Sequence, residues 1–205
     1  MPRWGMVIDL SRCIGCNACT IACKQENGTP PEVFFTRVLT REVGTFPKSN
    51  MNFLPVLCNH CSDPPCESIC PTGATYIRED GIVLVEKRKC IGCRACYVAC
   101  PYKNRFYISR KWNKKFGYFL DQASTFEEYK YKDHCPGTTM KCTLCSNRID
   151  ERLEPACVTT CLTDARVFGD LDDPSSEIAD LIFKKGGTRL LEGLNTNPSV
   201  YYVGG

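Results

Sequence analysis

The chain has 205 residues, which is enough for one domain, or two small fused domains, with a modest core. Its seventeen cysteines approach the density of a disulfide-stapled protein. However, their number is odd, their spacings are those of metal ligands, and no secretory hydrophobic region follows Met1, so we do not expect a disulfide scaffold. No run of eighteen apolar residues is present, so we expect no membrane-spanning segment.

The first half of the chain alternates cysteine runs with short strand patterns. Residues 6–10 are apolar and partly β-branched, which predicts a strand. The first run follows as Cys13-x2-Cys16-x2-Cys19-x3-Cys23. Residues 24–57 begin polar and turn-rich and end apolar. The second run is Cys58-x2-Cys61-x4-Cys66-x3-Cys70. Residues 75–78 and 82–85 then predict a hairpin around the Asp80-Gly81 turn.

The second half begins with the run Cys90-x2-Cys93-x2-Cys96-x3-Cys100. Residues 104–141 interrupt the pattern with nine aromatic side chains, interleaved with Arg105, Arg110, Lys111, Lys114, Lys115, Lys130 and Lys132. The fourth run is Cys142-x2-Cys145-x11-Cys157-x3-Cys161. A helix is predicted to begin at Asp173-Pro174 and to end at Gly186, with an apolar stripe of Ile178, Leu181 and Ile182. Residues 198–203 predict an extended tail.

The four runs are an internal repeat, and their spacing favours one metal chemistry over another. Iron–sulfur clusters and zinc both bind thiolates. The third run has the spacing of a bacterial ferredoxin, in which three thiolates hold one [4Fe–4S] cluster and the fourth reaches its neighbour. Small residues at Gly92 and Ala95 are expected to leave room for it. Zinc sites pair C-x2-C units across longer gaps, often with histidine, so a zinc-based interaction module is the weaker alternative.

Sixteen thiolates holding four clusters of about −2 each would change the formal charge from +3 to about −5. Nucleic-acid binding therefore gains little support. The sequence also has no Gly-rich phosphate loop, no nucleophile beside a plausible base and no paired carboxylates in context. We expect an electron-transfer protein with no catalytic site of its own.

Beyond the cysteines, three stretches match a known pattern: Met6-Val7-Ile8-Asp9, Cys70-Pro71-Thr72-Gly73-Ala74 and Phe168-Gly169-Asp170-Leu171-Asp172-Asp173-Pro174. Over nearly its whole length the chain resembles the four-cluster ferredoxin-like subunit of molybdopterin oxidoreductases, especially of polysulfide, dimethyl sulfoxide and arsenate reductases. The resemblance implies an α+β fold of two ferredoxin-like bicluster modules, one inserted in the other. The outer module would comprise residues 1–50 and 142–170, the inner module 51–103, an aromatic-rich insertion 104–141, and a C-terminal helix plus extended tail 171–205.

The resemblance also implies four [4Fe–4S] clusters, with the last cysteine of each run crossing to another cluster. The implied ligand sets are Cys13, Cys16, Cys19 and Cys161 (set 1); Cys23, Cys142, Cys145 and Cys157 (set 2); Cys58, Cys61, Cys66 and Cys100 (set 3); and Cys70, Cys90, Cys93 and Cys96 (set 4). Some relatives have a tryptophan in the third run and a three-iron cluster, but here Cys93 is present. Leu162 and Lys24 depart from the pattern without removing a ligand.

The implied partners are a large molybdenum- or tungsten-bis-pterin catalytic subunit at the Cys13 end and, at the Cys90 end, a membrane quinol-oxidising subunit or a soluble carrier. Such subunits often cross the membrane with a partner that carries the export signal. We therefore expect a membrane-associated complex on the extracytoplasmic face, with a cytoplasmic location as the alternative. Alternative functions are a free-standing polyferredoxin, or the iron–sulfur subunit of a hydrogenase or formate dehydrogenase.

Three features lie outside the repeat. His60 could tune a cluster through a hydrogen bond or could be a partly exposed loop histidine. Cys135 fits no run, and we predict that it ligates nothing. Residues 195–205 show no core face but contain Val200, Tyr201, Tyr202 and Val203, so we predict that they anchor the chain to the catalytic subunit, together with part of 104–141.

Overall fold

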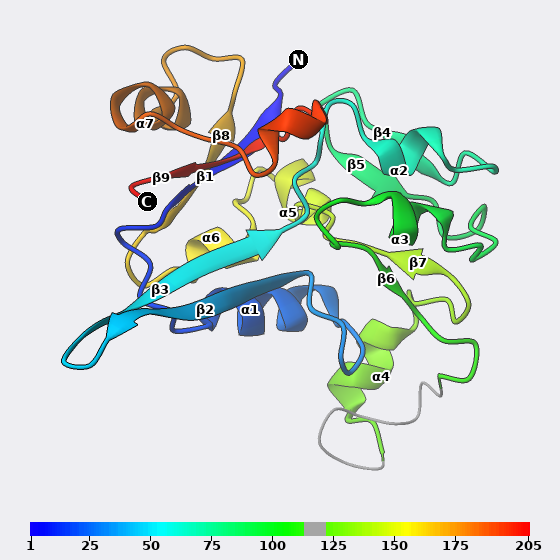
Figure 1. Ribbon diagram of the computed structural model, residues 1–205. Coiled ribbons are helices and arrows are strands. Elements are labelled where there is room, and N and C mark those ends of the chain that lie inside the picture. Colours follow the sequence, from blue (N-terminus) through cyan, green and yellow to red (C-terminus); the bar gives the residue numbers. More distant parts are fainter. Residues whose placement is uncertain (113–121) are drawn as a thin grey trace.

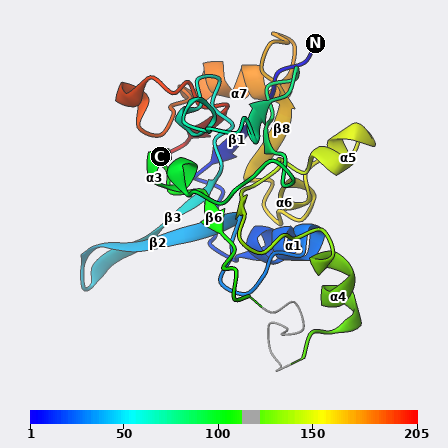
Figure 2. The same ribbon diagram turned by 90° about the vertical axis from the view of Figure 1, so that its right-hand side faces the viewer.

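The computed structural model describes residues 1–112 and 122–205 (Figures 1 and 2). Lys114 and Lys115, and three of the nine aromatic residues of the predicted insertion, lie outside these ranges. The fold mixes short helices and strands, as expected. Its largest sheet has the order β8-β1-β9 and joins both chain ends: β1 (Trp4–Asp9) pairs antiparallel with β8 (Arg166–Asp170) and parallel with β9 (Val200–Val203). β1 is the strand predicted from residues 6–10.

The C-terminal tail is a core strand, so the prediction that it lacks a core face is wrong. Val200, Tyr202 and Val203 are at most 3% exposed. The Tyr202 hydroxyl donates a hydrogen bond to the carbonyl of Pro55 at 2.9 Å. Because β1 is apolar on both faces and buried throughout the sheet, its free edge needs a partner, and β9 supplies one.

The helix α7 (Glu177–Lys185) covers this sheet. The Ser176 hydroxyl caps it by accepting a hydrogen bond from Ala179 N, so the predicted start at Asp173-Pro174 is three residues early. The predicted apolar stripe is confirmed, because Ile178 is fully buried against Val7 and Val203. The helix ends at Gly186 in a left-handed conformation, as predicted.

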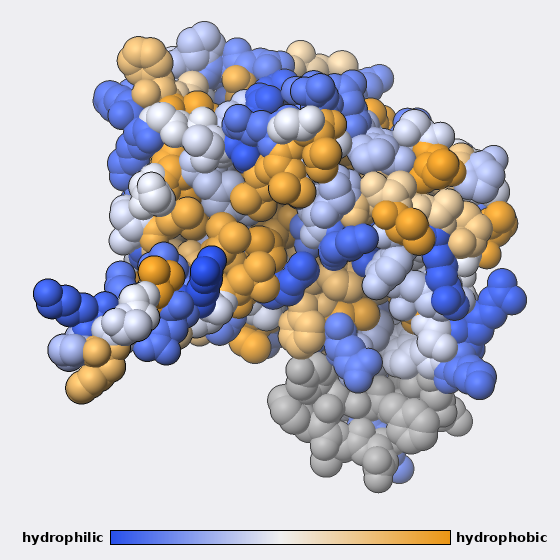
Figure 3. All heavy atoms as spheres, viewed as in Figure 1, coloured by the Kyte–Doolittle hydropathy of each residue, from blue (hydrophilic) through white to orange (hydrophobic). Residues whose placement is uncertain are grey.

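A long hairpin not predicted as such joins the first two cysteine runs. It consists of β2 (Thr36–Thr45) and β3 (Lys48–Leu57), paired over their full length. Only its base is buried; residues 39–52, which we call the hairpin arm, are exposed. The arm stands clear of the body in both ribbon views, and Figure 3 shows hydrophilic and hydrophobic side chains mixed along it.

The remaining elements are short and lie around the cysteine runs. They are α1 (Ala18–Asn27), α2 (Pro65–Ser68), β4 (Thr75–Ile77), β5 (Val83–Val85), α3 (Ala95–Ala99), β6 (Phe106–Tyr107), α4 (Thr125–Tyr131), β7 (Thr139–Met140), α5 (Ser146–Asp150), α6 (Ala156–Thr159) and a 3₁₀ turn (Glu192–Leu194). The β4–β5 hairpin confirms the prediction from Asp80-Gly81. α1 packs on α6, whereas α2 packs on α3. Among the described residues, no helix is both long and apolar enough to cross a membrane.

Candidate metal centres

Three of the implied cysteine sets each surround a separate cavity. Set 1 lines one cavity, set 3 a second and set 4 a third. Each cavity is lined by the four cysteines of one set and by no cysteine of another. In each case three thiols come from one run and the fourth from another run.

The fourth group, set 2, is the most deeply enclosed. Cys23, Cys142, Cys145 and Cys157 are all buried. Burial raises the pKa of the Cys23 thiol well above its usual value, and the charges of Cys142, Cys157 and Cys145 raise it further. Cys23 therefore interacts with the three cysteines of the fourth run, although it follows Cys19 by only four residues.

The first and third runs fold into the same loop. Gly15 and Gly92 both have φ near +70°, and the residues two positions later, Asn17 and Arg94, are also left-handed immediately before α1 and α3. This conformation turns the chain sharply enough for the second and third cysteines to face one cavity. Gly92 lines the set-4 cavity and also faces the chain at Gly137: an added Cβ would clash with the carbonyl oxygen of that residue. Gly92 therefore also accommodates the backbone at Gly137.

Burial raises the pKa of eight of these sixteen thiols, which favours their protonated form. It raises the pKa of Cys61 to about 12 and that of Cys145 to about 11. Cys70 and Cys161, the last cysteines of the second and fourth runs, differ: burial opposes ionisation, but hydrogen bonds outweigh it and lower the pKa. In Cys161, one of them is donated by Ala165 N at 3.3 Å. A metal centre bound here must displace protons from the buried thiols.

Orphaned donors around set 3 fit an anionic, sulfur-rich group. Asn59 is buried and lines the set-3 cavity, and neither its amide nitrogen nor its amide oxygen has a hydrogen-bond partner among the described residues. Arg105 lines the same cavity, and its Nε and Nη2 atoms also lack partners in the described part of the chain. Unpaired buried donors are costly, and the sulfur atoms of a cluster accept such hydrogen bonds. The donors present therefore fit a [4Fe–4S] cluster.

The sets differ in exposure along the molecule. Cys16 in set 1 and Cys93 in set 4 are exposed, whereas every cysteine of set 2 is buried. The two exposed loops also present apolar side chains to solvent: Ile14, Ile21 and Leu162 at set 1, and Ile91, Tyr97 and Val98 at set 4. Sets 1 and 4 therefore have the accessible surfaces that an electron donor or acceptor requires.

His60 is not the exposed loop residue that one interpretation allowed. It is 1% exposed, and its Nδ1 accepts a hydrogen bond from Val83 N at 3.1 Å. Burial lowers its pKa, and the charges of Lys141 and Arg105 lower it further, so the ring is neutral with the proton on Nε2. Cys135 is exposed and lines none of the three cysteine cavities.

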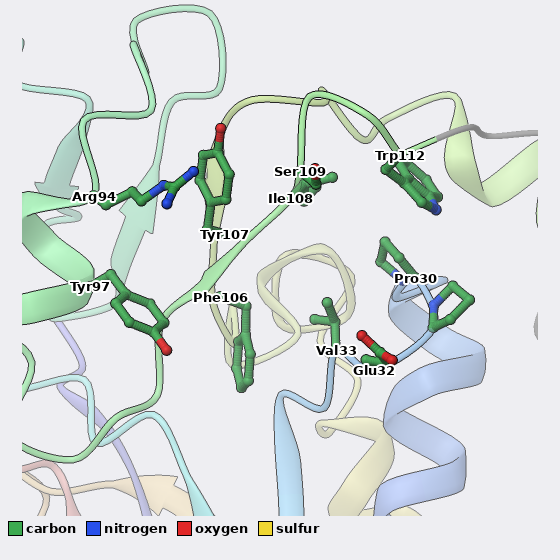
Figure 4. Close-up of a pocket in the computed structure, with 11 residues that line it drawn as sticks. Pro30, Glu32, Val33, Arg94, Tyr97, Phe106, Tyr107, Ile108, Ser109 and Trp112 are labelled. Carbon is green, nitrogen blue, oxygen red and sulfur yellow. The ribbon is translucent and has the colours of Figure 1, made fainter.

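An open pocket beside set 4 contains no cysteine (Figure 4). It lies between the 30–33 loop and β6, with Tyr97, Phe106, Tyr107 and Trp112 in its walls. The Arg94 guanidinium stacks on the Tyr107 ring at 3.9 Å from its centroid. The aromatic residues of segment 104–112 thus pack next to the loop that holds Cys93.

Sequence reasoning missed three buried cations near the cysteines: Arg105, Lys141 and Arg166. One signal was available for two of them. Arg105 follows Cys100 by five residues, and Arg166 follows Cys161 by five. A charged residue at the same offset from the last cysteine of two repeats indicates a role tied to that repeat.

Comparison with known proteins agrees with this geometry. The 4Fe-4S dicluster domain family matches residues 49–117 and 122–171, and a second family of the same description matches residues 12–74. The chain is 40% identical to the putative iron–sulfur subunit of a dimethyl sulfoxide reductase of Halobacterium salinarum, covering all of this chain and 80% of that one. It is 42% identical to a subunit of the selenate reductase of Mesobacillus selenatarsenatis (98% and 72% covered), and 38% identical to the arsenate respiratory reductase iron–sulfur subunit of a Shewanella species (98% and 96% covered).

These matches extend over the whole described structure and include every cysteine run. Two dicluster domains account for four [4Fe–4S] clusters, and sixteen of the seventeen cysteines suffice to hold them. Two of these relatives are named as iron–sulfur subunits of reductases, which makes electron transfer the function of this kind of chain. The chain belongs to the four-cluster ferredoxin-like iron–sulfur subunits of the molybdopterin oxidoreductase family.

Proposed function

We propose that the sixteen cysteines hold four [4Fe–4S] clusters in the four crossed sets, and that the chain relays single electrons between two partner proteins. The observation that supports it most is that three separate cavities are each lined by one complete set. Each bound cluster supplies one-electron oxidation and reduction. The residues of this chain bind the iron through thiolates, exclude water from set 2 and donate hydrogen bonds to sulfur.

The proposed relay order is set 1, set 2, set 3, set 4. Each consecutive pair has thiols close enough to interact electrostatically. Burial is the main cause of the raised pKa values of Cys157, Cys142 and Cys96, and a thiol of a neighbouring set adds to each. Cys19 of set 1 acts on Cys157 of set 2, and Cys58 of set 3 acts on Cys142 of set 2. Cys66 of set 3 acts on Cys96 of set 4. The exposed sets then stand at the two ends of the relay and the buried set 2 lies inside it.

Contacts between helices and strands support the inserted-module arrangement. β1 pairs with β8 and α1 packs on α6, which unites residues 1–50 with 142–170. The β4–β5 hairpin and the α2–α3 contact unite residues 51–103. The boundary after residue 50 falls inside β3, so the β2–β3 hairpin belongs to the junction between the modules.

We place the molybdenum- or tungsten-pterin catalytic subunit at the set-1 end, because the hairpin arm begins there. Val38 and Pro55, at the base of the hairpin, line the set-1 cavity. Beyond the base, the arm exposes Leu39, Val43, Met51 and, at its tip, Phe46, which is 92% exposed. A two-stranded hairpin with both faces in water is marginally stable, so a partner that covers it would stabilise it. The arm takes over the anchoring role that the sequence suggested for residues 195–205.

At the set-4 end we propose a membrane quinol-interacting subunit or a soluble carrier, bound over Ile91, Tyr97 and Val98 and beside the aromatic pocket. The whole would form a membrane-associated complex on the extracytoplasmic face through co-export with a partner, with a cytoplasmic complex as the alternative. A free-standing polyferredoxin is less favoured, because a lone shuttle has no use for the arm.

The test is to shorten the arm by joining Arg41 to Asn52 through an Asn-Gly turn, which these paired residues permit. In cells that co-express the catalytic subunit, the shortened chain should keep about sixteen irons but no longer co-purify with that subunit. Phe46→Ser should weaken the association, whereas Phe183→Ser, at a site of similar exposure on α7, should leave it unchanged. Equal co-purification of the shortened and full-length chains would contradict the proposed docking.

A further inference from the structure

Three buried cations divide the four cysteine sets. Arg166 and Lys141 are 3% exposed and Arg105 is 1% exposed. None makes an ion pair with a carboxylate among the described residues. Burying a cation is costly unless negative charge compensates it, and the nearby source of negative charge is the thiolates.

Arg166 lies between sets 1 and 2. It lines the set-1 cavity, and its charge acts on Cys19 of set 1 and Cys157 of set 2. Its Nη2 donates a hydrogen bond to Thr36 Oγ1 at 2.9 Å, which fixes the guanidinium at the start of β2.

Arg105 repeats this arrangement between sets 3 and 4. It lines the set-3 cavity, and its charge acts on Cys66 of set 3 and Cys96 of set 4. Its Nη1 donates to Thr75 Oγ1 at 3.2 Å, at the start of β4. In both modules the arginine therefore stands between the third cysteines of two runs and is held by the first threonine of a strand.

Lys141 occupies the remaining gap, between sets 2 and 3. It precedes Cys142 of set 2, and its Nζ donates to the carbonyls of Cys142 at 2.7 Å and of Val83. Its charge also acts on Cys66 of set 3. Each of the three gaps in the relay thus contains one buried cation.

We propose that Arg166, Lys141 and Arg105 are positioning residues for electron transfer, each of which raises the reduction potentials of the two clusters on either side of its gap. This inference rests on the ligand sets of the proposed function. Reduction adds one electron, and thus one negative charge, to a cluster that is already anionic. A fixed cation in a site of low polarity stabilises that extra charge, and one cation between two clusters acts on both. Neighbouring clusters therefore keep similar reduction potentials.

The test replaces each cation singly with a neutral residue, as Arg166→Gln, Lys141→Met and Arg105→Gln, in the assembled complex. Redox titration followed by electron paramagnetic resonance, with dithionite as the reductant, should show two cluster signals moving to lower potential in each variant. The reduced-to-oxidised ratio of those two clusters at a fixed potential should fall about tenfold, which is a 59 mV shift for a one-electron couple. The Arg166 and Arg105 pairs should share no signal, and Lys141 should move one signal from each pair.

The charge-conserving variants Arg166→Lys and Arg105→Lys should keep most of the wild-type reduction potential and so show little shift. Arg12→Gln, next to Cys13 but on the surface, should move no signal, because solvent screens its charge. If a glutamine variant loses iron, the threonine that holds the arginine is changed instead, as Thr36→Val for Arg166 or Thr75→Val for Arg105. This loosens the guanidinium and should give a smaller shift in the same two signals. Full iron content with no shift, or an equal shift of all signals, overturns the proposal. If iron were lost from cysteines that belong to different proposed sets, the proposed ligand sets would be contradicted instead.

Discussion

The proposed outer module, with sets 1 and 2, and the proposed inner module, with sets 3 and 4, are surrounded by very different amounts of secondary structure. In the outer module, β1 pairs with β8, and the C-terminal segment 171–205 adds the second flanking strand β9 and the covering helix α7. Next to the inner module, the segment after Cys100, which belongs to the insertion 104–141, forms the two-residue strand β6, which pairs with the equally short β7. Both nonetheless have the same glycine loop and the same arginine–threonine pair.

The comparison shows that the cysteine geometry does not depend on a large sheet. The loops of the repeat set the thiol positions, and metal binding supplies much of the folding free energy of such small modules. The additional strand β9 and helix α7, which the C-terminal segment 171–205 supplies, instead cover β1. We therefore expect changes in cysteines to have similar effects in both modules, and changes in packing to differ between them.

The largest effect is expected from removing a crossed ligand. Cys23→Ser should lower the iron content by about four of sixteen atoms, through loss of the cluster held by Cys142, Cys145 and Cys157. The cluster of Cys13, Cys16 and Cys19 should survive, although Cys23 belongs to the same run. Iron analysis with electron paramagnetic resonance checks this. Cys70→Ser is the matched change in the inner module and should affect the cluster of Cys90, Cys93 and Cys96. Loss of the Cys13 cluster in Cys23→Ser would show that the ligands do not cross.

The next effect separates the modules by packing. Tyr202→Ala should destabilise the outer module by about 3–5 kcal/mol, because it leaves a cavity beside β1 and removes the hydrogen bond to Pro55. Tyr202→Phe keeps the ring and should cost about 1 kcal/mol. Thermal loss of the cluster absorbance measures both. If Tyr202→Ala left stability unchanged while weakening association with the catalytic subunit, β9 would be a partner contact after all.

Two equivalent glycines should respond unequally. Gly15→Ala and Gly92→Ala both force a side chain into the left-handed region, at a cost of about 1–2 kcal/mol. At Gly15 the new Cβ meets the ring of Phe53, which can rotate, but at Gly92 it meets the backbone carbonyl of Gly137. Gly92→Ala should therefore be the more destabilising change and should loosen segment 104–112 on set 4. Proteolysis of the two variants compares them, and equal protection would contradict this contact.

What the sequence predicted were features of local chemistry. Cysteine spacing and the Asp80-Gly81 turn each depend on a few neighbouring residues. The pairing of Cys13 with the distant Cys161, in contrast, came only from the resemblance to a known family. The pairing of β9 could not be predicted from the residues around it, because its partner β1 lies almost the whole chain length away in the sequence. Arg105 and Arg166 share an offset of five residues after a cysteine run, but their burial could not be predicted, since a charged residue usually indicates a surface.

The smallest expected effect concerns the seventeenth cysteine. Cys135 follows His134, whose imidazole is buried and hydrogen-bonded to the carbonyl of Gly28 at 2.7 Å, yet the Cys135 side chain is exposed. Its backbone carbonyl, not its thiol, makes the local contact, by accepting a hydrogen bond from Thr138 Oγ1. Cys135→Ser should therefore retain about sixteen irons and an unchanged redox titration, in contrast to Cys23→Ser and Cys70→Ser. Loss of about four irons would show that Cys135 is a ligand, and one of the four sets would then have to release a cysteine.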